Sequence, residues 1–207
     1  AMGCTIRYEY GLFRQKLVDG YQVEVPDNWL DEGNIWEIPR PDQTVEVHFG
    51  GRVEEYEDAF GRMNFRTVDS VMVQAVPYDM FVAGKDGRGV SVLRLWSSEG
   101  TGIDMSLFNQ GQHLKAIERD AMAQTICKIL YPADNHPEGK SLRLRQQYFL
   151  VSASIQDIVA RHLRDYDSLA NFAELNAIHI NDTHPTMAIP ELMRIMLDEC
   201  GYGWDDA

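Results

Sequence analysis

Four polar residues stand together at Asn181, Asp182, Thr183 and His184, immediately before a proline and an apolar segment that is expected to be helical. Asp182 can accept hydrogen bonds, whereas Asn181 and His184 can donate or accept them. Sugar hydroxyls need partners of this mixed kind, while the N–H groups at a helix start need acceptors. The four residues therefore either line a site or cap the helix. Asp182 and His184 could also share a metal ion, but no third ligand follows at suitable spacing.

A second polar segment, YPADNHPEGK (131–140), separates two apolar segments and contains Asp134 and Asn135. Loops held between helices often carry functional residues, although Asp and Asn also favour ordinary turns. Arg143 and Arg145 follow just inside the next expected helix. Because they are two residues apart they face different directions, and one of them could point inward, where its charge would need a partner.

The N-terminal segment IRYEYG (6–11) alternates charged and aromatic residues. Alternation places Arg7 and Glu9 on one face of a strand, which predicts a cross-strand ion pair. None of the five lysines stands in a context typical of a Schiff base, and the chain has no GxSxG motif and no P-loop; the lysines are Lys16, Lys85, Lys115, Lys128 and Lys140.

Residues 1–100 are predicted to be mainly strands that lead up to these segments. In QTVEVHFG, Val45, Val47 and Phe49 alternate with polar residues, which is the period of a strand. GKDGRG (84–89) has the composition of a turn, and VSVLRLWSS after it is interpreted as a buried strand that carries Arg94. The short connections favour an antiparallel meander.

Residues 101–207 are predicted to be mainly helices. The segments 109–130 and 141–166 each repeat apolar residues at the spacing of one helical face. In the first these residues are Leu114, Ile117, Met122, Ile126 and Ile129, and in the second they are Leu144, Tyr148, Val151, Ile155, Ile158 and Val159.

The polar quartet stands between a short strand expected at 176–180 (NAIHI) and a helix expected over 187–199 that ends near Gly201. In α/β proteins ligands often bind beyond the carboxyl end of a strand, at such a strand–loop–helix junction. The sequence thus predicts one α/β domain over 1–207, with a mixed sheet, an antiparallel meander in its first half and long helices in its second.

The overall charge limits the possible partners. The chain of 207 residues is 44% hydrophobic and 25% charged, with a net charge of −13. These proportions are typical of a globular core. The acidic balance disfavours a nucleic-acid partner and an anionic membrane surface, whereas a neutral substrate such as a sugar is compatible with it.

The cysteines and the apolar runs indicate the compartment. Cys4, Cys127 and Cys200 are odd in number and far apart, which favours a reducing environment and a cytoplasmic location. No apolar run reaches the roughly 18 residues of a transmembrane helix, and the N-terminal residues do not have the pattern of a signal peptide. The abrupt start and end suggest a segment of a longer protein.

Several long segments together resemble the glycogen and maltodextrin phosphorylase family. They occur in order from Gly3 to about Trp204 and include GCTIRYEYGLFRQK, DNWLDEGNIWEIPRP, VHFGGRVE, VPYD, LRLWSS, LYPADNHPEGKSLRLRQQYF and INDTHPTMAIPELMRIMLDE. The resemblance covers nearly the whole chain. It implies an internal piece of the family's N-terminal domain, which is Rossmann-like and of the GT-B type.

The resemblance implies a reaction and a cofactor for the full-length parent. That enzyme transfers the terminal α-1,4-linked glucose of an α-glucan to inorganic phosphate and gives glucose 1-phosphate. Its pyridoxal phosphate is held on a lysine that has no counterpart among these 207 residues. The resemblance therefore implies that the isolated chain is inactive and contains no catalytic, cofactor-binding or metal-binding residue. It also implies a homodimeric parent, with the helix near 112–125 packing across the interface.

The resemblance assigns substrate-binding roles to five residues. The loop with Asp134 and Asn135 matches one that gates the cleft, and Asn135 matches the residue that reaches the bound glucose. Arg143, Asp182 and His184 match positions that line a polar pocket beside that glucose.

Two positions depart from the animal members of the family. The arginine pair that binds the phosphate of AMP is here Ala160-Arg161, so activation by AMP is not expected. The aromatic residue that stacks purine inhibitors is here His136. Two other functions compete with a phosphorylase fragment: a different GT-B glycosyltransferase, which would not share NDTHPTMAIPELMR, and a non-catalytic carbohydrate-binding or scaffold module.

Overall fold

The computed structural model describes residues 1–11, 13–57, 59–61 and 63–207. The chain divides into two compact units. The first consists of Ala1–Thr44 and Gln74–Gln146, and the second of Val45–Val73 and Gln147–Ala207. The fold is mixed α/β: the described strands end by Glu99 and the α-helices begin at Met105. Each unit nevertheless contains strands and helices, because strands from the first half pack with helices from the second.

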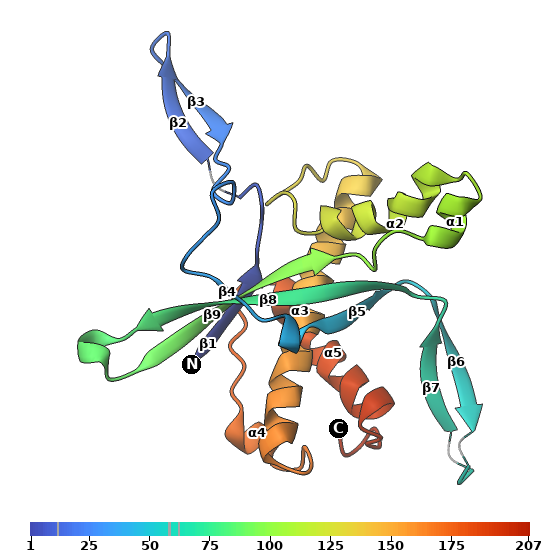
Figure 1. The fold of residues 1–207 in the computed structure, drawn as a ribbon. Coiled ribbons are helices and arrows are strands. Elements are labelled where there is room, and N and C mark those ends of the chain that lie inside the picture. The colour runs from blue at the N-terminus through green and yellow to red at the C-terminus, as the bar shows by residue number, and fades with distance from the viewer. Residues whose placement is uncertain (12, 58, 62) are drawn as a thin grey trace. The chain divides into compact units, whose positions relative to one another are not determined.

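The sheet of the first unit is centred on two long strands, β8 (Val71–Ala83) and β9 (Val90–Glu99), as Figure 1 shows. They pair antiparallel from Ala83↔Val90 to Gln74↔Glu99. The expected turn at 84–89 joins them and contains the short 3₁₀-helix Lys85–Gly87. The predicted turn and the antiparallel pairing of the strands beside it are therefore confirmed.

Two shorter strands complete this order as β1-β9-β8-β4, and β5 (Val45–Phe49) also pairs with β8. β4 (Ile38–Pro39) pairs antiparallel with β8, but β1 (Met2–Ile6) pairs parallel with β9. The expectation of antiparallel pairing thus fails at β1. The long connection between β1 and β9 allows the return that parallel neighbours require. A separate hairpin is formed by β2 (Phe13–Val18) and β3 (Tyr21–Pro26).

A buried ion pair lies inside this sheet. Arg94 on β9 is directly opposite Asp79 on β8, and the two side chains are 1% and 4% exposed. The guanidinium also donates to Gln43, the last residue of the 3₁₀-helix Pro41–Gln43, and Arg40 lies 3.7 Å from Asp79. The predicted buried strand carrying Arg94 is confirmed, and its charge is satisfied by a partner on the neighbouring strand.

The ion pairs of the N-terminal segment differ from the expected cross-strand pair. Arg7 binds Glu37, which precedes β4, at 2.8 Å. Glu9 binds Lys128, beyond the second helix, at 2.7 Å. Both residues lie past the end of β1, and their charged partners come from the loop before β4 and from the segment that follows α2.

The helix predicted over 109–130 is wrong in its limits and in its buried face. The chain forms α1 (Met105–Asn109) and α2 (His113–Thr125), with a turn at Gly111 between them. Alanines provide the buried contacts of α2, since Ala116 and Ala123 are buried. Of the five predicted core residues of this segment only Ile126 is buried, while Leu114, Ile117, Met122 and Ile129 are exposed. Small side chains allow α2 to lie close to its neighbours, which periodicity alone does not reveal.

The long helix α3 (Pro137–Asp165) begins four residues before its predicted start and passes from the first unit into the second. Val151, Ile155 and Val159 lie on its buried face, as the apolar spacing predicts. Leu144 is instead exposed. No described helix is both long and apolar enough to span a membrane.

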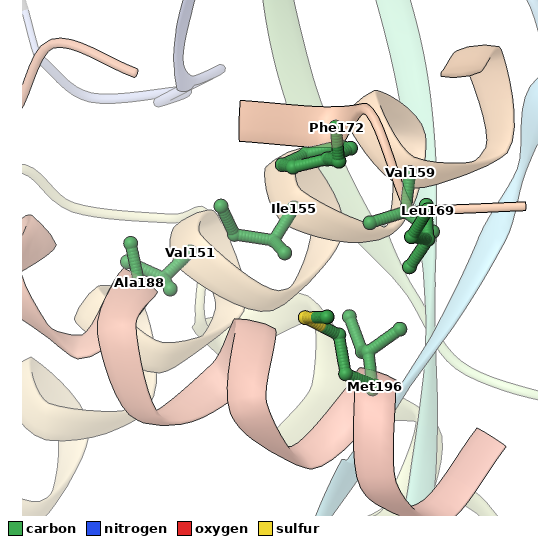
Figure 2. Close-up of a cluster of buried hydrophobic side chains, with 8 residues drawn as sticks. Val151, Ile155, Val159, Leu169, Phe172, Ala188 and Met196 are labelled. Carbon is green, nitrogen blue, oxygen red and sulfur yellow. The ribbon is translucent and has the colours of Figure 1, made fainter. Parts of the chain in front are cut away.

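The core of the second unit forms between α3 and the C-terminal helices, as Figure 2 shows. α4 (Phe172–Leu175) contributes Phe172, and α5 (Ala188–Arg194) contributes Ala188. Figure 2 shows Met196, from the π-helical turn Ile195–Glu199, pointing towards the same cluster. The unit also contains a hairpin of β6 (Arg52–Glu57) and β7 (Met63–Val68).

The C-terminal helix ends as predicted, but the strand before it is not formed. The π-helical turn stops at Glu199, and Gly201 follows with a left-handed φ of 72°, the usual conformation of a residue just past a helix. Residues 176–180 were expected to form a strand and instead have no regular structure. No strand in the described part of the chain pairs with this segment, and an unpaired strand lacks the hydrogen bonds that define it.

Candidate functional site

The polar quartet adopts a conformation in which its side chains do not cap the following helix. Asp182 has a φ of 73°, which few residues other than glycine adopt readily. Its Oδ1 accepts a hydrogen bond from the backbone N–H of Thr183 at 2.6 Å. Thr183 precedes the 3₁₀-helix His184–Met187, yet its side chain makes no capping hydrogen bond. The capping interpretation therefore loses its support, and an unusual backbone conformation remains at Asp182.

Asp182 and His184 face each other across this turn. Asp182 Oδ2 lies 3.6 Å from His184 Nε2, and the side chains are 60% and 36% exposed. The N–H of Thr183, and then the positive field of His184, hold the pKa of Asp182 below its usual value. Asp182 is thus an anionic acceptor beside an imidazole that can donate, and both reach solvent.

A buried carboxylate holds the helix that follows the quartet. Glu191 on α5 is 3% exposed and accepts hydrogen bonds from Ser152 at 2.7 Å and from Tyr148 at 3.2 Å, both on α3. Arg194 donates to the same carboxylate at 2.9 Å from two of its nitrogens. A buried carboxylate is stable only when hydrogen bonds and an opposite charge compensate it in this way. The contacts fix α5, and with it the end of the 3₁₀-helix His184–Met187 that carries His184.

The other three predicted residues belong to the first unit: Asp134 and Asn135 lie in the loop before α3, and Arg143 lies on α3. Asp134 forms an ion pair with Arg143. Asn135 is exposed, and its side chain has no hydrogen-bond partner among the residues that the structure describes. The loop thus holds one carboxylate in place and leaves the neighbouring amide available to a ligand.

A glycine missed by the sequence reasoning brings this loop onto the helix. A Cβ atom at Gly139 would lie 1.8 Å from the carbonyl oxygen of Ala133, far inside contact distance. Gly139 is in the first turn of α3 and is buried. Glycine inside a helix ordinarily weakens it. A glycine at position 139, in the first turn of a helix, therefore indicates that another part of the backbone comes close to it.

Replacing Gly139 with alanine is expected to destabilise the chain by about 1–3 kcal/mol, because the new methyl group must displace the Ala133 carbonyl. At an ordinary helical position the same change would stabilise the protein by about 0.4–1 kcal/mol. Urea unfolding measures the difference. Gly89→Ala is the control, since a Cβ there meets nothing within 4 Å. A stabilising Gly139→Ala would show that the close approach is absent.

In the part of the chain that the structure describes, Cys127 and the lysines stand in settings that do not favour covalent catalysis. Burial raises the pKa of Cys127 to about 12, so its thiol stays protonated near neutral pH. Lys128 is neutralised by Glu9, and the other four lysines are exposed. Within the described residues no three His, Cys, Asp or Glu side chains gather as metal ligands.

The structure also shows the surroundings of Ala160 and Arg161, which stand where the sequence resemblance implies an arginine pair. Arg161 Nε lies 3.0 Å from the carboxylate of Asp157, one turn earlier on α3. Ala160 is exposed and supplies no donor. One arginine that already has a carboxylate partner is a poor substitute for a pair that binds a phosphate.

The sequence matches a known family along its entire length. The family described as Carbohydrate phosphorylase matches residues 1–207, so the chain belongs to the carbohydrate phosphorylase family. It is 46% identical to a glycogen phosphorylase of Haemophilus influenzae, 45% identical to one of Bacillus subtilis and 44% identical to one of Synechocystis. These alignments cover 99–100% of this chain but only 24–25% of the relatives. The chain therefore spans about a quarter of their length.

Proposed function

We propose that this chain is part of an α-glucan phosphorylase, which transfers the terminal α-1,4-linked glucose of glycogen or maltodextrin to inorganic phosphate. The observation that carries the proposal is the family match over all 207 residues, with relatives called glycogen phosphorylase. We further propose that residues 1–207 form the central part of a Rossmann-like, GT-B type N-terminal domain. The mixed sheet and long helices are compatible with that architecture.

We assign substrate binding to Asp134, Asn135, Arg143, Asp182 and His184. Their chemistry supports the assignment, because a carboxylate with a lowered pKa, an imidazole and a free amide provide the acceptors and donors that sugar hydroxyls need. Arg143 holds Asp134 by an ion pair. No residue of the chain is assigned to the bond-breaking step itself.

The pyridoxal phosphate of the proposed parent does not fit the residues of this chain. A Schiff-base lysine reacts as a free amine and is typically desolvated or placed beside another cation. Here Lys128 is paired with Glu9 at 2.7 Å, and the other lysines are open to solvent. We therefore expect the cofactor to be held outside these 207 residues.

Two further properties of the parent are proposed. We propose a homodimer in which α2 contributes to the interface, because Leu114, Ile117 and Met122 leave apolar surface exposed on that helix. We also propose a cytoplasmic location, which the free cysteines support, since reduced thiols are typical of that compartment.

The direct test is to express the full reading frame that encodes this chain. The full-length protein should form glucose 1-phosphate from maltodextrin and phosphate. If it carries out another transfer, such as transfer from a sugar nucleotide, the proposal fails. If it binds maltodextrin without turnover, a carbohydrate-binding module becomes the better description.

The isolated 207-residue chain is expected to bind no pyridoxal phosphate and to form no glucose 1-phosphate. The reason is the absence of a lysine in a suitable setting. Incubation with the cofactor, dialysis and an absorbance spectrum measure aldimine formation, and an enzymatic assay measures glucose 1-phosphate. A persistent aldimine band that disappears when one lysine is replaced would contradict this expectation.

A further inference from the structure

His136 occupies the N-cap of α3, a position usually taken by Ser, Thr, Asp or Asn. The helix begins at Pro137, and the backbone carbonyl of His136 accepts the N–H of Lys140 at 3.1 Å. The ring nitrogen Nδ1 lies 3.0 Å from the N–H of Gly139 and accepts its hydrogen bond. A ring nitrogen can accept only while it carries no proton. The cap therefore requires His136 with an unprotonated Nδ1.

A carboxylate competes for the same ring nitrogen. Glu138 Oε2 lies 3.2 Å from His136 Nδ1. An ionised carboxylate can only accept, so this contact becomes a hydrogen bond only when Nδ1 is protonated. With Nδ1 unprotonated the ring bonds to Gly139, and with Nδ1 protonated it bonds to Glu138. One atom thus serves two mutually exclusive partners.

The other charges near this junction come from the helix start, the loop and α3. The ring lies at the positive end of the helix dipole, and a carboxylate oxygen of Glu138 lies 3.2 Å from Nδ1. Asp134 and Arg143, from the loop and from α3, are paired with each other. Among the residues that the structure describes, Glu138 is the carboxylate that lies within 4.0 Å of the His136 ring nitrogens.

We propose that His136 is a positioning residue for the loop 131–136, and that protonation of its ring releases the N-cap of α3. The link is Gly139, whose N–H binds the ring and whose Cα is approached by the carbonyl of Ala133. Losing the cap therefore loosens the residue against which the loop rests. The loop is therefore expected to lose order at low pH, where Nδ1 carries a proton.

The consequence for activity rests on the proposed function. The loop carries Asp134 and Asn135, to which sugar binding is assigned. A less ordered loop would present Asn135 less precisely to the glucan, and turnover would fall with decreasing pH. The cap itself can be tested without measuring activity.

Hydrogen exchange of the full-length protein, followed by mass spectrometry and corrected for intrinsic rates, tests the cap. Amides within 137–143 are expected to be about fivefold less protected near pH 5.5 than near pH 8, the factor that corresponds to one lost N-cap. His136→Asn keeps an acceptor that does not titrate, so its protection should stay high at both pH values. His136→Ala should be low at both.

Two controls separate the cap from general destabilisation. Peptides from 151–159, in the buried part of α3, should show no such step. Glu138→Gln removes the partner of the protonated ring, so the step should move to lower pH. A wild-type protein without the step, or a His136→Asn variant that keeps it, would overturn the proposal.

Turnover measured on the same variants distinguishes this proposal from the proposed function. If kcat for maltodextrin phosphorolysis falls with the exchange step and is restored in His136→Asn, both stand. If the exchange results hold but His136→Ala turns over like wild type, the cap stands and the sugar-binding role of the loop fails.

Discussion

Replacing Arg94 with leucine is expected to lower the free energy of unfolding of the chain by about 3–5 kcal/mol, because the buried carboxylate of Asp79 loses both hydrogen bonds and keeps the longer contact with Arg40 at 3.7 Å. Arg94 donates from Nε and Nη2 to the two oxygens of Asp79, each at 2.7 Å. Nη2 also donates to Gln43 at 2.6 Å. Both partners of the ion pair are almost fully buried, so water cannot replace the lost bonds. Urea unfolding of the two proteins measures the effect.

The matched control is Arg14→Leu, which removes a pair of similar length at the surface. Arg14 lies 2.7 Å from Asp27 and is 65% exposed, so its loss should cost no more than about 1 kcal/mol. The double variant of Arg94→Leu with Asp79→Leu should recover much of the loss, since it removes both charges. An Arg94→Leu variant as stable as Arg14→Leu would show that the pair is not desolvated.

The strand pairing could be predicted where local sequence determines it. The turn at 84–89 sets the register of β8 and β9, because Ala83 and Val90 are the first pair beside it. Counting four residues back from Ala83 and four forward from Val90 gives Asp79 and Arg94. The register of this turn would therefore have predicted Asp79 as the partner of Arg94. Predicting a buried strand at Arg94 was not enough to identify that partner.

The helices show where periodicity is insufficient. On α3 the apolar spacing identified Val151, Ile155 and Val159, which are buried. On α2 the same kind of spacing identified Leu114 and Ile117, which are exposed. A hydrophobic stripe shows which residues share a face, but not whether another part of the same chain covers it. That depends on tertiary contacts that a single sequence does not contain.

Residue types suggested the candidate site, but they did not suggest the contacts that support it. Asp182 and His184 are polar neighbours in the sequence, and their side chains lie 3.6 Å apart. Glu191 holds α5 in place, but it lies within the helix predicted over 187–199 and was not predicted to have a role. Its partners are on α3, about forty residues earlier in the chain. Only folding brings such distant residues together.

Replacing Asn135 with alanine in the full-length enzyme is expected to lower kcat by roughly 10²–10³-fold, with a smaller change in KM. The amide is exposed and has no partner in the described part of the chain, so it is free to bind a ligand. Most of the glucan affinity is expected to come from sugar units farther from the reacting bond. A hydrogen bond that strengthens as the glycosidic bond breaks therefore affects turnover more than binding.

The alternative is that Asn135 only shapes the turn before α3. In that case the alanine variant would melt at a lower temperature and, once folded, would turn over almost normally. Asn28→Ala is a suitable control, because Asn28 is also exposed and its carbonyl accepts the N–H of Asp31 in a turn. Measuring kcat, KM and melting temperature for both variants decides the question. A normal kcat together with a lowered melting temperature for Asn135→Ala would remove Asn135 from the site, because a residue that contacts the reacting glucose cannot be lost without slowing the reaction.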